Sequence, residues 1–227
     1  QLVHFAAKKA FNVEGLGDKI IEQFLRAGLL NDSADIFNLK RQSLLDLERF
    51  AEKKANNLLS AIEKSKQITL PKFLYSLSIS HIGEETAIAL AKKIEQVKSQ
   101  TAPAENMKNW LSRYLTNIKA EELETIRDIG PKVAKSIYDW FHLTKNQKLL
   151  DRLFKNGVEI LSIPNTADSQ TKQLTGKTFV FTGELKTLSR EAAEAKIREL
   201  GGRPSSAVSA KTDYVIAGGK PGSKLTK

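Results

Sequence analysis

The stretch VEGLGDKII (residues 13–21) places two glycines, two residues apart, directly before an apolar run with helical spacing. Three later stretches resemble it: LERFAEKKA (47–55), ISHIGEETA (79–87) and IRDIGPKVA (126–134). Each has an apolar residue, two variable residues, a second apolar residue, a small residue or glycine, and then the opening of a helix. Their starts are 34, 32 and 47 residues apart. Repeats at such intervals indicate repeated supersecondary units.

The chain from residue 1 to about 161 is predicted to be almost entirely helical, because apolar residues recur at helical spacing between the repeats. A tight turn between helices needs a position that tolerates positive φ, which glycine supplies. Gly17, Gly83 and Gly130 each stand just before a predicted helix. Ala51 holds the corresponding place in the second repeat and resists positive φ. We therefore expect the second turn to run differently or to contact a ligand poorly.

Turns of this kind are candidate phosphate sites. The first amides of a helix have no intrahelical partner and carry the positive end of the helix dipole, so a phosphate can dock there without a large basic patch. Nearby lysines, Lys53 among them, add charge-assisted contacts, and Pro131 fits a first helical turn. Such contacts bind the backbone of a nucleic acid and do not read its bases. The candidate residues are Gly15, Gly17, Lys19, Lys54, Gly83, Thr86, Gly130, Lys132 and Lys135.

The formal net charge of +10 favours a polyanionic partner. The first 171 residues carry 25 basic and 21 acidic side chains, so their charge is nearly balanced. This part therefore needs a local binding site, rather than overall charge, to bind phosphate. The chain has no cysteine, which excludes disulfides and thiolate metal sites and fits a reducing cytoplasm. It has no apolar run long enough to span a bilayer and no signal-peptide pattern. Because the chain begins with Gln1 and its one methionine is Met107, we expect a piece of a longer protein.

Other polar and aromatic residues are given structural roles. The three histidines lie far apart and lack ligand companions, so no metal site is expected at His4, His81 or His142. Four aromatic residues at helical spacing are predicted to lie in the core, namely Trp110, Tyr114, Tyr138 and Trp140. The carboxylate pairs Glu84-Glu85 and Glu121-Glu122 are interpreted as charged helix starts.

VEGLG, ISHIG and IRDIG resemble helix-hairpin-helix motifs, the sequence-independent DNA-binding unit. Four in tandem, opened by HFAAKKAFNVEGLG (4–17), are similar to the corresponding domain of bacterial NAD-dependent DNA ligases. The resemblance continues through LLDLERFAEKKANNLLSAIEKSK (44–66), LPKFLYSLSISHIGEETA (70–87) and LLDRLFKNGVEI (149–160). It implies a mainly α domain over residues 1–161, whose four motifs form two pseudo-symmetric pairs and grip duplex DNA around a nick. The second motif departs from the family, which usually has glycines in place of Arg49 and Ala51.

The remaining residues change character. SIPNTADSQTKQ (162–173) is predicted to be a linker. A short β run (179–181), a helix capped by Ser189 (189–202) and a second strand (212–218) follow. This order resembles the start of a small α/β BRCT domain, truncated over 174–227. In phosphopeptide-reading relatives the matching residues bind phosphate, so a candidate site consists of Thr182, Gly183 and Lys224, although a plain packing module is the favoured interpretation.

The resemblance also implies properties of a whole enzyme. It would seal nicks in DNA replication and repair with NAD, Mg²⁺ and Zn²⁺, in the bacterial cytoplasm at the nucleoid. It would act as a monomer, with a protein partner for its BRCT part. The KxDG motif that carries the adenylated lysine is missing, since AKTDYV (210–215) lacks its glycine, and the family's four-cysteine zinc module is missing too. We therefore expect no catalytic residue and no bound cofactor in this chain.

Two alternatives stay open. One is another helix-hairpin-helix enzyme, such as a base-excision glycosylase, whose catalytic aspartate follows a single hairpin by about twenty residues. Asp151 lies 21 residues after Gly130, but within a predicted helix and after four hairpins rather than one. The other alternative is a scaffold that binds DNA with its hairpins and protein with its BRCT part.

Overall fold

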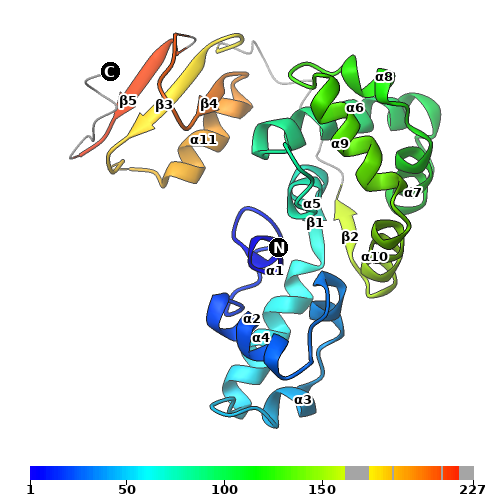
Figure 1. Ribbon diagram of the computed structural model, residues 1–227. Helices are drawn as coiled ribbons and strands as arrows, with labels where there is room; N and C mark the ends of the chain where they lie inside the picture. Colours follow the sequence, from blue (N-terminus) through cyan, green and yellow to red (C-terminus); the bar gives the residue numbers. More distant parts are fainter. Residues whose placement is uncertain (162–173, 186, 211, 220–227) are drawn as a thin grey trace. The chain divides into compact units, whose positions relative to one another are not determined.

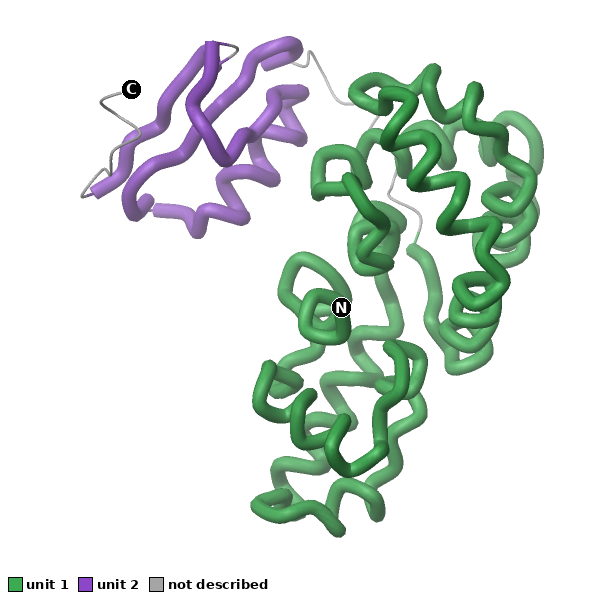
Figure 2. The backbone as a smooth tube through the Cα atoms, in the orientation of Figure 1, with its two compact units in different colours: residues 1–163 green, residues 164–227 purple. Residues whose placement is uncertain are grey.

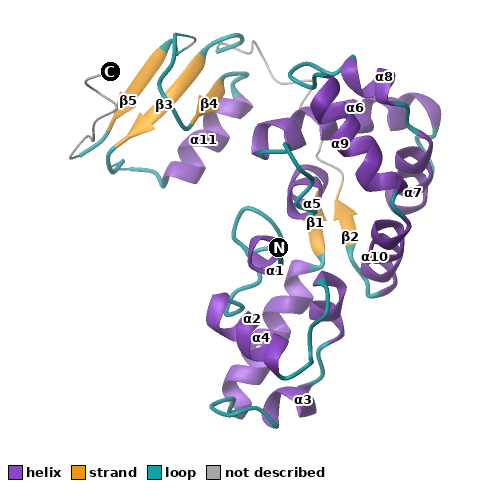
Figure 3. Ribbon diagram, viewed as in Figure 1, coloured by secondary structure: helices purple, strands orange, loops and turns teal. Residues whose placement is uncertain are grey.

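The computed structural model describes residues 1–161, 174–185, 187–210 and 212–219. The chain divides into two compact units, Gln1–Ile163 and Pro164–Lys227 (Figure 2). The first unit is built mostly of helices, whereas the described part of the second combines a small parallel sheet with a helix (Figure 3). The predicted fold class, mainly α followed by a partial α/β domain, is confirmed. The predicted linker (162–173) and Lys224 lie outside the described residues.

Four pairs of consecutive helices make up most of the first unit (Figure 1). We call them hairpins 1 to 4: α1 (Leu2–Ala6) with α2 (Asp18–Arg26), α3 (Arg41–Leu45) with α4 (Glu52–Ser65), α5 (Leu70–Ser76) with α6 (Glu84–Thr101), and α8 (Ala120–Glu124) with α9 (Pro131–His142). Three further helical segments connect or follow them: the 3-10 helix η1 (Ser33–Asn38) after hairpin 1, α7 (Met107–Asn117) after hairpin 3, and α10 (Thr144–Lys155) after hairpin 4. In the part of the chain that the structure describes, no helix is both long and apolar enough for a bilayer.

A two-stranded parallel sheet joins the middle of the first unit to its end. Strand β1 (Gln67–Thr69) pairs with β2 (Glu159–Leu161), with Ile68 opposite Ile160. The prediction of an almost entirely helical region missed this sheet. Strands of three residues are too short to show an alternating pattern, and each strand is defined by a partner that lies far away in the sequence.

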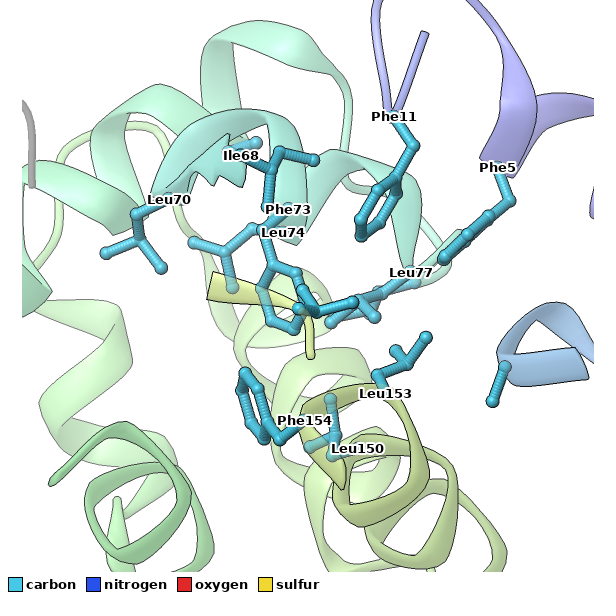
Figure 4. Packing of buried hydrophobic residues seen from close by; sticks show 14 of the residues in the cluster. Phe5, Phe11, Ile68, Leu70, Phe73, Leu74, Leu77, Leu150, Leu153 and Phe154 are labelled. Atoms are coloured by element: carbon cyan, nitrogen blue, oxygen red, sulfur yellow. The ribbon is translucent and has the colours of Figure 1, made fainter. Parts of the chain in front are cut away.

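One apolar core runs through all four hairpins. Its aromatic part begins at hairpin 1, where the Phe5 and Phe11 rings stack with centroids 4.3 Å apart. Phe73 on α5 continues it, with ring centroids 6.4 Å from Phe11 and 5.7 Å from Phe154 on α10. Figure 4 shows these rings meeting among Leu77, Leu150 and Leu153, among others. Hairpins 1 and 2 therefore share their core with hairpins 3 and 4.

The aromatic residues predicted for the core divide into two groups. Trp110 is buried, and Tyr114 stacks on it with ring centroids 4.6 Å apart and donates to Glu122 Oε1 at 2.7 Å. Trp140 is half-buried against the core. The prediction is wrong for Tyr138, whose side chain lies on the exposed face of α9 and stacks on His142. Helical spacing alone did not separate the two faces of α9.

Within its described residues, the second unit has a three-stranded parallel sheet and one helix. β3 (Thr178–Thr182) lies between β4 (Arg203–Ser205) and β5 (Tyr214–Ala217). The helix α11 (Arg190–Glu199) follows β3 and packs Ala193 and Ile197 against the apolar side chains of that strand. The Ser189 hydroxyl accepts the Ala192 amide at 3.2 Å, which confirms the predicted cap.

Candidate nucleic-acid interface

The four hairpin turns have one backbone conformation. In each turn, the fourth residue donates its amide to the carbonyl of the first, at 3.0–3.2 Å. The bonds run from Leu16 to Val13, Phe50 to Leu47, Ile82 to Ile79, and Ile129 to Ile126. These apolar residues are buried or half-buried, whereas the two residues between them are exposed in every turn. Apolar anchors therefore fix each turn and leave its tip at the surface.

The third residue of each turn is left-handed, with φ of 83° at Gly15, 63° at Arg49, 67° at His81 and 66° at Asp128. The N-cap residue two positions later is extended, with φ between −80° and −92° at Gly17, Ala51, Gly83 and Gly130. The prediction that the glycines before the helices supply positive φ is therefore wrong. The prediction that the second turn runs differently is also wrong, because Ala51 occupies an ordinary extended position and Arg49 itself adopts positive φ.

The N-cap glycines need another explanation. Their φ values suit any residue, and a Cβ built on Gly17, Gly83 or Gly130 meets no atom of the chain within 4 Å. Neither backbone conformation nor internal packing thus requires glycine at these three places. A side chain there would instead occupy the open space in front of the helix. All three glycines are exposed, so the space in front of each helix is open.

The helices behind the turns present uncapped N-termini. The N-cap residues of α2, α4, α6 and α9 make no side-chain cap hydrogen bond. The first amides bonded to the N-cap carbonyls are those of Ile20, Lys54, Ala87 and Val133. The amides before them carry the partial positive charge of the helix end. Among these four helices, α9 alone has no acidic residue in its first turn, and it has Pro131 at the predicted position. Its N-terminus is the most favourable of the four for an anion.

The predicted lysines are exposed but differ in their neighbours. Lys135 forms an ion pair with Asp139 at 2.7 Å, and the Lys54 ammonium lies 4.1 Å from the centre of the Phe50 ring. Among the described residues, no ion pair is found for Lys19 or Lys132. Thr86 is half-buried on α6. Sequence reasoning missed Lys9, which reaches from the loop of hairpin 1 to Glu84 in the first turn of α6 at 2.8 Å.

Strain at the turn of hairpin 2 gives a stability prediction. We expect Arg49→Val to lower the free energy of unfolding by about 1–2 kcal/mol, because a β-branched residue resists positive φ. Arg49→Gly should stay within about 0.5 kcal/mol, since relief of strain and the added freedom of the unfolded chain offset each other. Urea unfolding followed by tryptophan fluorescence measures both. Glu48→Val is the matched control, since its side chain is similarly exposed, at 86% against 89% for Arg49, and φ at Glu48 is not positive.

Lys132 and Lys135 give a second prediction, because Lys135 forms an ion pair with Asp139 and Lys132 forms none among the described residues. If the first turn of α9 meets phosphate, Lys132→Gln weakens duplex binding about equally on all sequences. It also makes the negative slope of log affinity against log salt shallower, by about 1. Lys135→Gln should change the slope less, because Asp139 already neutralises this ammonium. Fluorescence anisotropy across a salt series tests both, and equal slopes for wild type and Lys132→Gln would contradict the assignment.

The candidate phosphate site of the second unit is only partly described. Thr182 is buried at the end of β3, and Gly183 follows with φ of 75°. A Cβ on Gly183 would lie 2.6 Å from the Gly219 carbonyl oxygen, because Glu184 and Gly219 exchange two backbone hydrogen bonds of 2.9 and 2.7 Å. Glycine is thus explained at position 183 by close backbone pairing. The phosphate role of these residues stays a prediction.

The residues considered for other chemistry are scattered. Asp151, the aspartate of the glycosylase alternative, is an exposed residue of α10. Across the described ranges, no group of three or more histidine, aspartate or glutamate side chains is placed to hold a metal ion. His4 Nδ1 lies 3.0 Å from the Ser78 hydroxyl, a contact between α1 and the end of α5. These contacts fit structural roles.

Four helix pairs with identical turns and open N-termini define a helix-hairpin-helix tandem, and the second unit has the strand and helix order of a BRCT domain. Family models agree: a SAM-like helix-hairpin-helix tandem matches residues 8–64, a helix-hairpin-helix motif matches 111–150, and the BRCA1 C Terminus (BRCT) domain matches 169–227. The sequence-based prediction of both elements is confirmed.

Alignments over nearly the whole chain show similarity to one part of longer proteins. The chain is 43% identical over 224 residues to a DNA ligase of Coxiella burnetii, 40% over 227 residues to one of Geotalea uraniireducens, and 40% over 226 residues to one of Nitrosococcus oceani. These alignments cover 99–100% of the chain but 31% of each relative. The chain is homologous to the C-terminal region of DNA ligases and spans about a third of the length of these relatives.

Proposed function

We propose that this chain is the DNA-gripping region of an NAD-dependent DNA ligase. It holds duplex DNA on both sides of a nick through backbone phosphates, without reading sequence. The observation that carries the proposal is the shared geometry of the turns. Neither the backbone conformation nor the packing of the chain requires glycine at Gly17, Gly83 or Gly130. Each of these glycines stands directly before a helix N-terminus that it does not cap with a side chain. Phosphate is the group that such a site accepts.

The chemistry of the enzyme belongs to other regions. The family's reaction transfers AMP from NAD to a lysine, then to the 5′ phosphate, and finally joins that phosphate to the 3′ hydroxyl. This chain has no KxDG motif and no cysteine for a thiolate zinc site. We therefore assign NAD, Mg²⁺ and Zn²⁺ to the rest of the protein, and no catalytic residue to this chain. We also place the enzyme in the bacterial cytoplasm at the nucleoid, as a monomer with a protein partner for its BRCT unit.

Equilibrium binding tests the proposal. We expect the isolated chain to bind nicked and intact duplexes of unrelated sequence with similar affinity. Log affinity should fall linearly with log salt at a slope near −0.9 per phosphate contacted. An unrelated protein of equal net charge serves as the control for non-specific attraction. Absent or salt-insensitive binding would refute the proposal. Cleavage of damaged bases by the chain alone would support the glycosylase alternative instead.

A further inference from the structure

A cluster of ion pairs and hydrogen bonds joins two segments that lie more than a hundred residues apart. Arg152 on α10 donates to the carboxylates of Asp32 and Asp35, the latter at 2.5 Å. Asn156, the C-cap of α10, donates from Nδ2 to the Ala34 carbonyl at 2.9 Å. Asp32 is the N-cap of η1, between hairpins 1 and 2, whereas α10 follows hairpin 4. We call these five residues, Asp32, Ala34, Asp35, Arg152 and Asn156, the Arg152 clamp.

The acidic half of the clamp is fixed by its own backbone. Asp35 Oδ2 accepts the amides of Asn31 and Asp32 at 2.7 and 3.1 Å, and Asp32 Oδ1 accepts the Ala34 amide at 2.9 Å. Burial raises the pKa of Asp35, but these amide donors and Arg152 outweigh it and lower that pKa below its usual 3.8. Both carboxylates are thus held in place and Asp35 is ionised at neutral pH. The planar guanidinium of Arg152 can bridge them with a defined orientation.

Stability alone is a weak explanation of the clamp. The side chains of Arg152 and Asp32 are 42% and 39% exposed, and that of Asp35 is 17% exposed. Ion pairs with such exposed partners contribute little to folding. The two halves of the unit already share the apolar core around Phe73. Apolar packing is non-directional, however, whereas a bridging guanidinium favours a particular orientation. The clamp therefore adds orientation between hairpins 1–2 and hairpins 3–4.

We propose that Arg152 is a positioning residue that sets hairpins 1–2 against hairpins 3–4 so that both pairs meet one duplex. This inference rests on the proposed function. When two binding modules are held at the spacing of their sites, binding of one raises the effective concentration of the other and increases the overall affinity. This increase becomes smaller when the orientation between the modules is less fixed. The gain exists only on a duplex long enough for both modules. Loss of the clamp should therefore weaken binding to long duplexes selectively.

The test compares two duplex lengths at one salt concentration, about one helical turn (roughly 10 base pairs) and about three turns (roughly 30 base pairs). The main variant of the 227-residue chain is the double substitution Asp32→Asn and Asp35→Asn, since asparagine keeps an oxygen for the backbone caps. It raises the net charge from +10 to +12, so electrostatics alone would tighten binding. We expect the opposite: at least about fivefold weaker binding to the long duplex and less than about twofold change on the short one.

Matched variants separate positioning from charge and from folding. Arg152→Gln should show the same dependence on length, whereas equal losses on both duplexes would mean direct phosphate contact and overturn the inference. Arg113→Gln removes the same charge and an ion pair with Glu105 of 2.7 Å within the second half, and it should show no dependence on length. Thermal unfolding monitors folding. If the double variant does not fold, Arg152→Lys replaces it. Lysine keeps the positive charge but lacks the planar guanidinium that bridges two carboxylates, so the same loss on the long duplex alone is expected.

The inference and the proposed function fail differently. A wild-type chain that binds neither duplex refutes the proposed function. A wild-type chain that binds both, with a double variant that binds the long duplex as tightly or more tightly, overturns the positioning role of Arg152 alone.

Discussion

Replacing Gly17, Gly83 and Gly130 together by leucine weakens duplex binding by at least about 100-fold, and does so equally on unrelated sequences. Each leucine side chain fills the open space before an uncapped helix and blocks approach of a phosphate. A hydrogen bond to a charged group is worth about 1.5–3 kcal/mol, so the loss of one contact per turn accounts for this magnitude. Fluorescence anisotropy with duplexes of several sequences measures the effect.

The fold should survive these substitutions. The three positions have extended backbone and no neighbouring atom within 4 Å of a Cβ, so each leucine costs about 1 kcal/mol or less through its weaker N-cap preference. Circular dichroism and thermal unfolding check this. Ala51→Leu is the matched control in hairpin 2, which we expect to contact DNA poorly. A folded triple variant that keeps full affinity would contradict the role of the turns, and so would a loss on one sequence only.

Phe73→Ala is expected to lower the free energy of unfolding of the first unit by about 3–5 kcal/mol. Phe73 is fully buried between Phe11 of hairpin 1 and Phe154 of α10, so its loss leaves a cavity where the two halves meet. Urea unfolding followed by tryptophan fluorescence reports on this unit alone, because both tryptophans of the chain, Trp110 and Trp140, lie in it.

Leu143→Ala is the control for Phe73→Ala, because Leu143 is 46% exposed. Surface substitutions of this kind usually stay within about 0.5 kcal/mol. Similar losses for the two variants would show that the shared aromatic core does not hold the halves of the unit together.

Local patterns predicted the features that depend on local physics. The hairpins follow from apolar spacing and the glycine or alanine before each helix, and the cap of α11 follows from Ser189. The positions with positive φ could not be predicted from residue type. Arg49 and Asp128 adopt positive φ because the flanking apolar anchors impose it. A turn imposed by buried anchors accepts several residue types at its tip.

Features made by distant partners could not be predicted from the sequence. The pairing of β1 with β2 leaves no local pattern in the sequence. In the sequence, Arg152 cannot be distinguished from other charged residues of an amphipathic helix, because its role depends on the contact between α10 and η1. The exposure of Tyr138 depends on which face of α9 packs against the core. For the candidate site, the sequence indicated the turns and the lysines, but not that the N-cap glycines stand before open space.

The most direct test of the central claim is the change of backbone amide NMR shifts when a duplex is added to the chain. We expect the largest changes at the amides of residues 17–20, 83–86 and 130–133, apart from Pro131, which has no N–H. The amides of α7 and of β1 should change little. Large changes confined to other surfaces, with the turns before α2, α6 and α9 unaffected, would contradict the claim that these turns bind the phosphates of DNA.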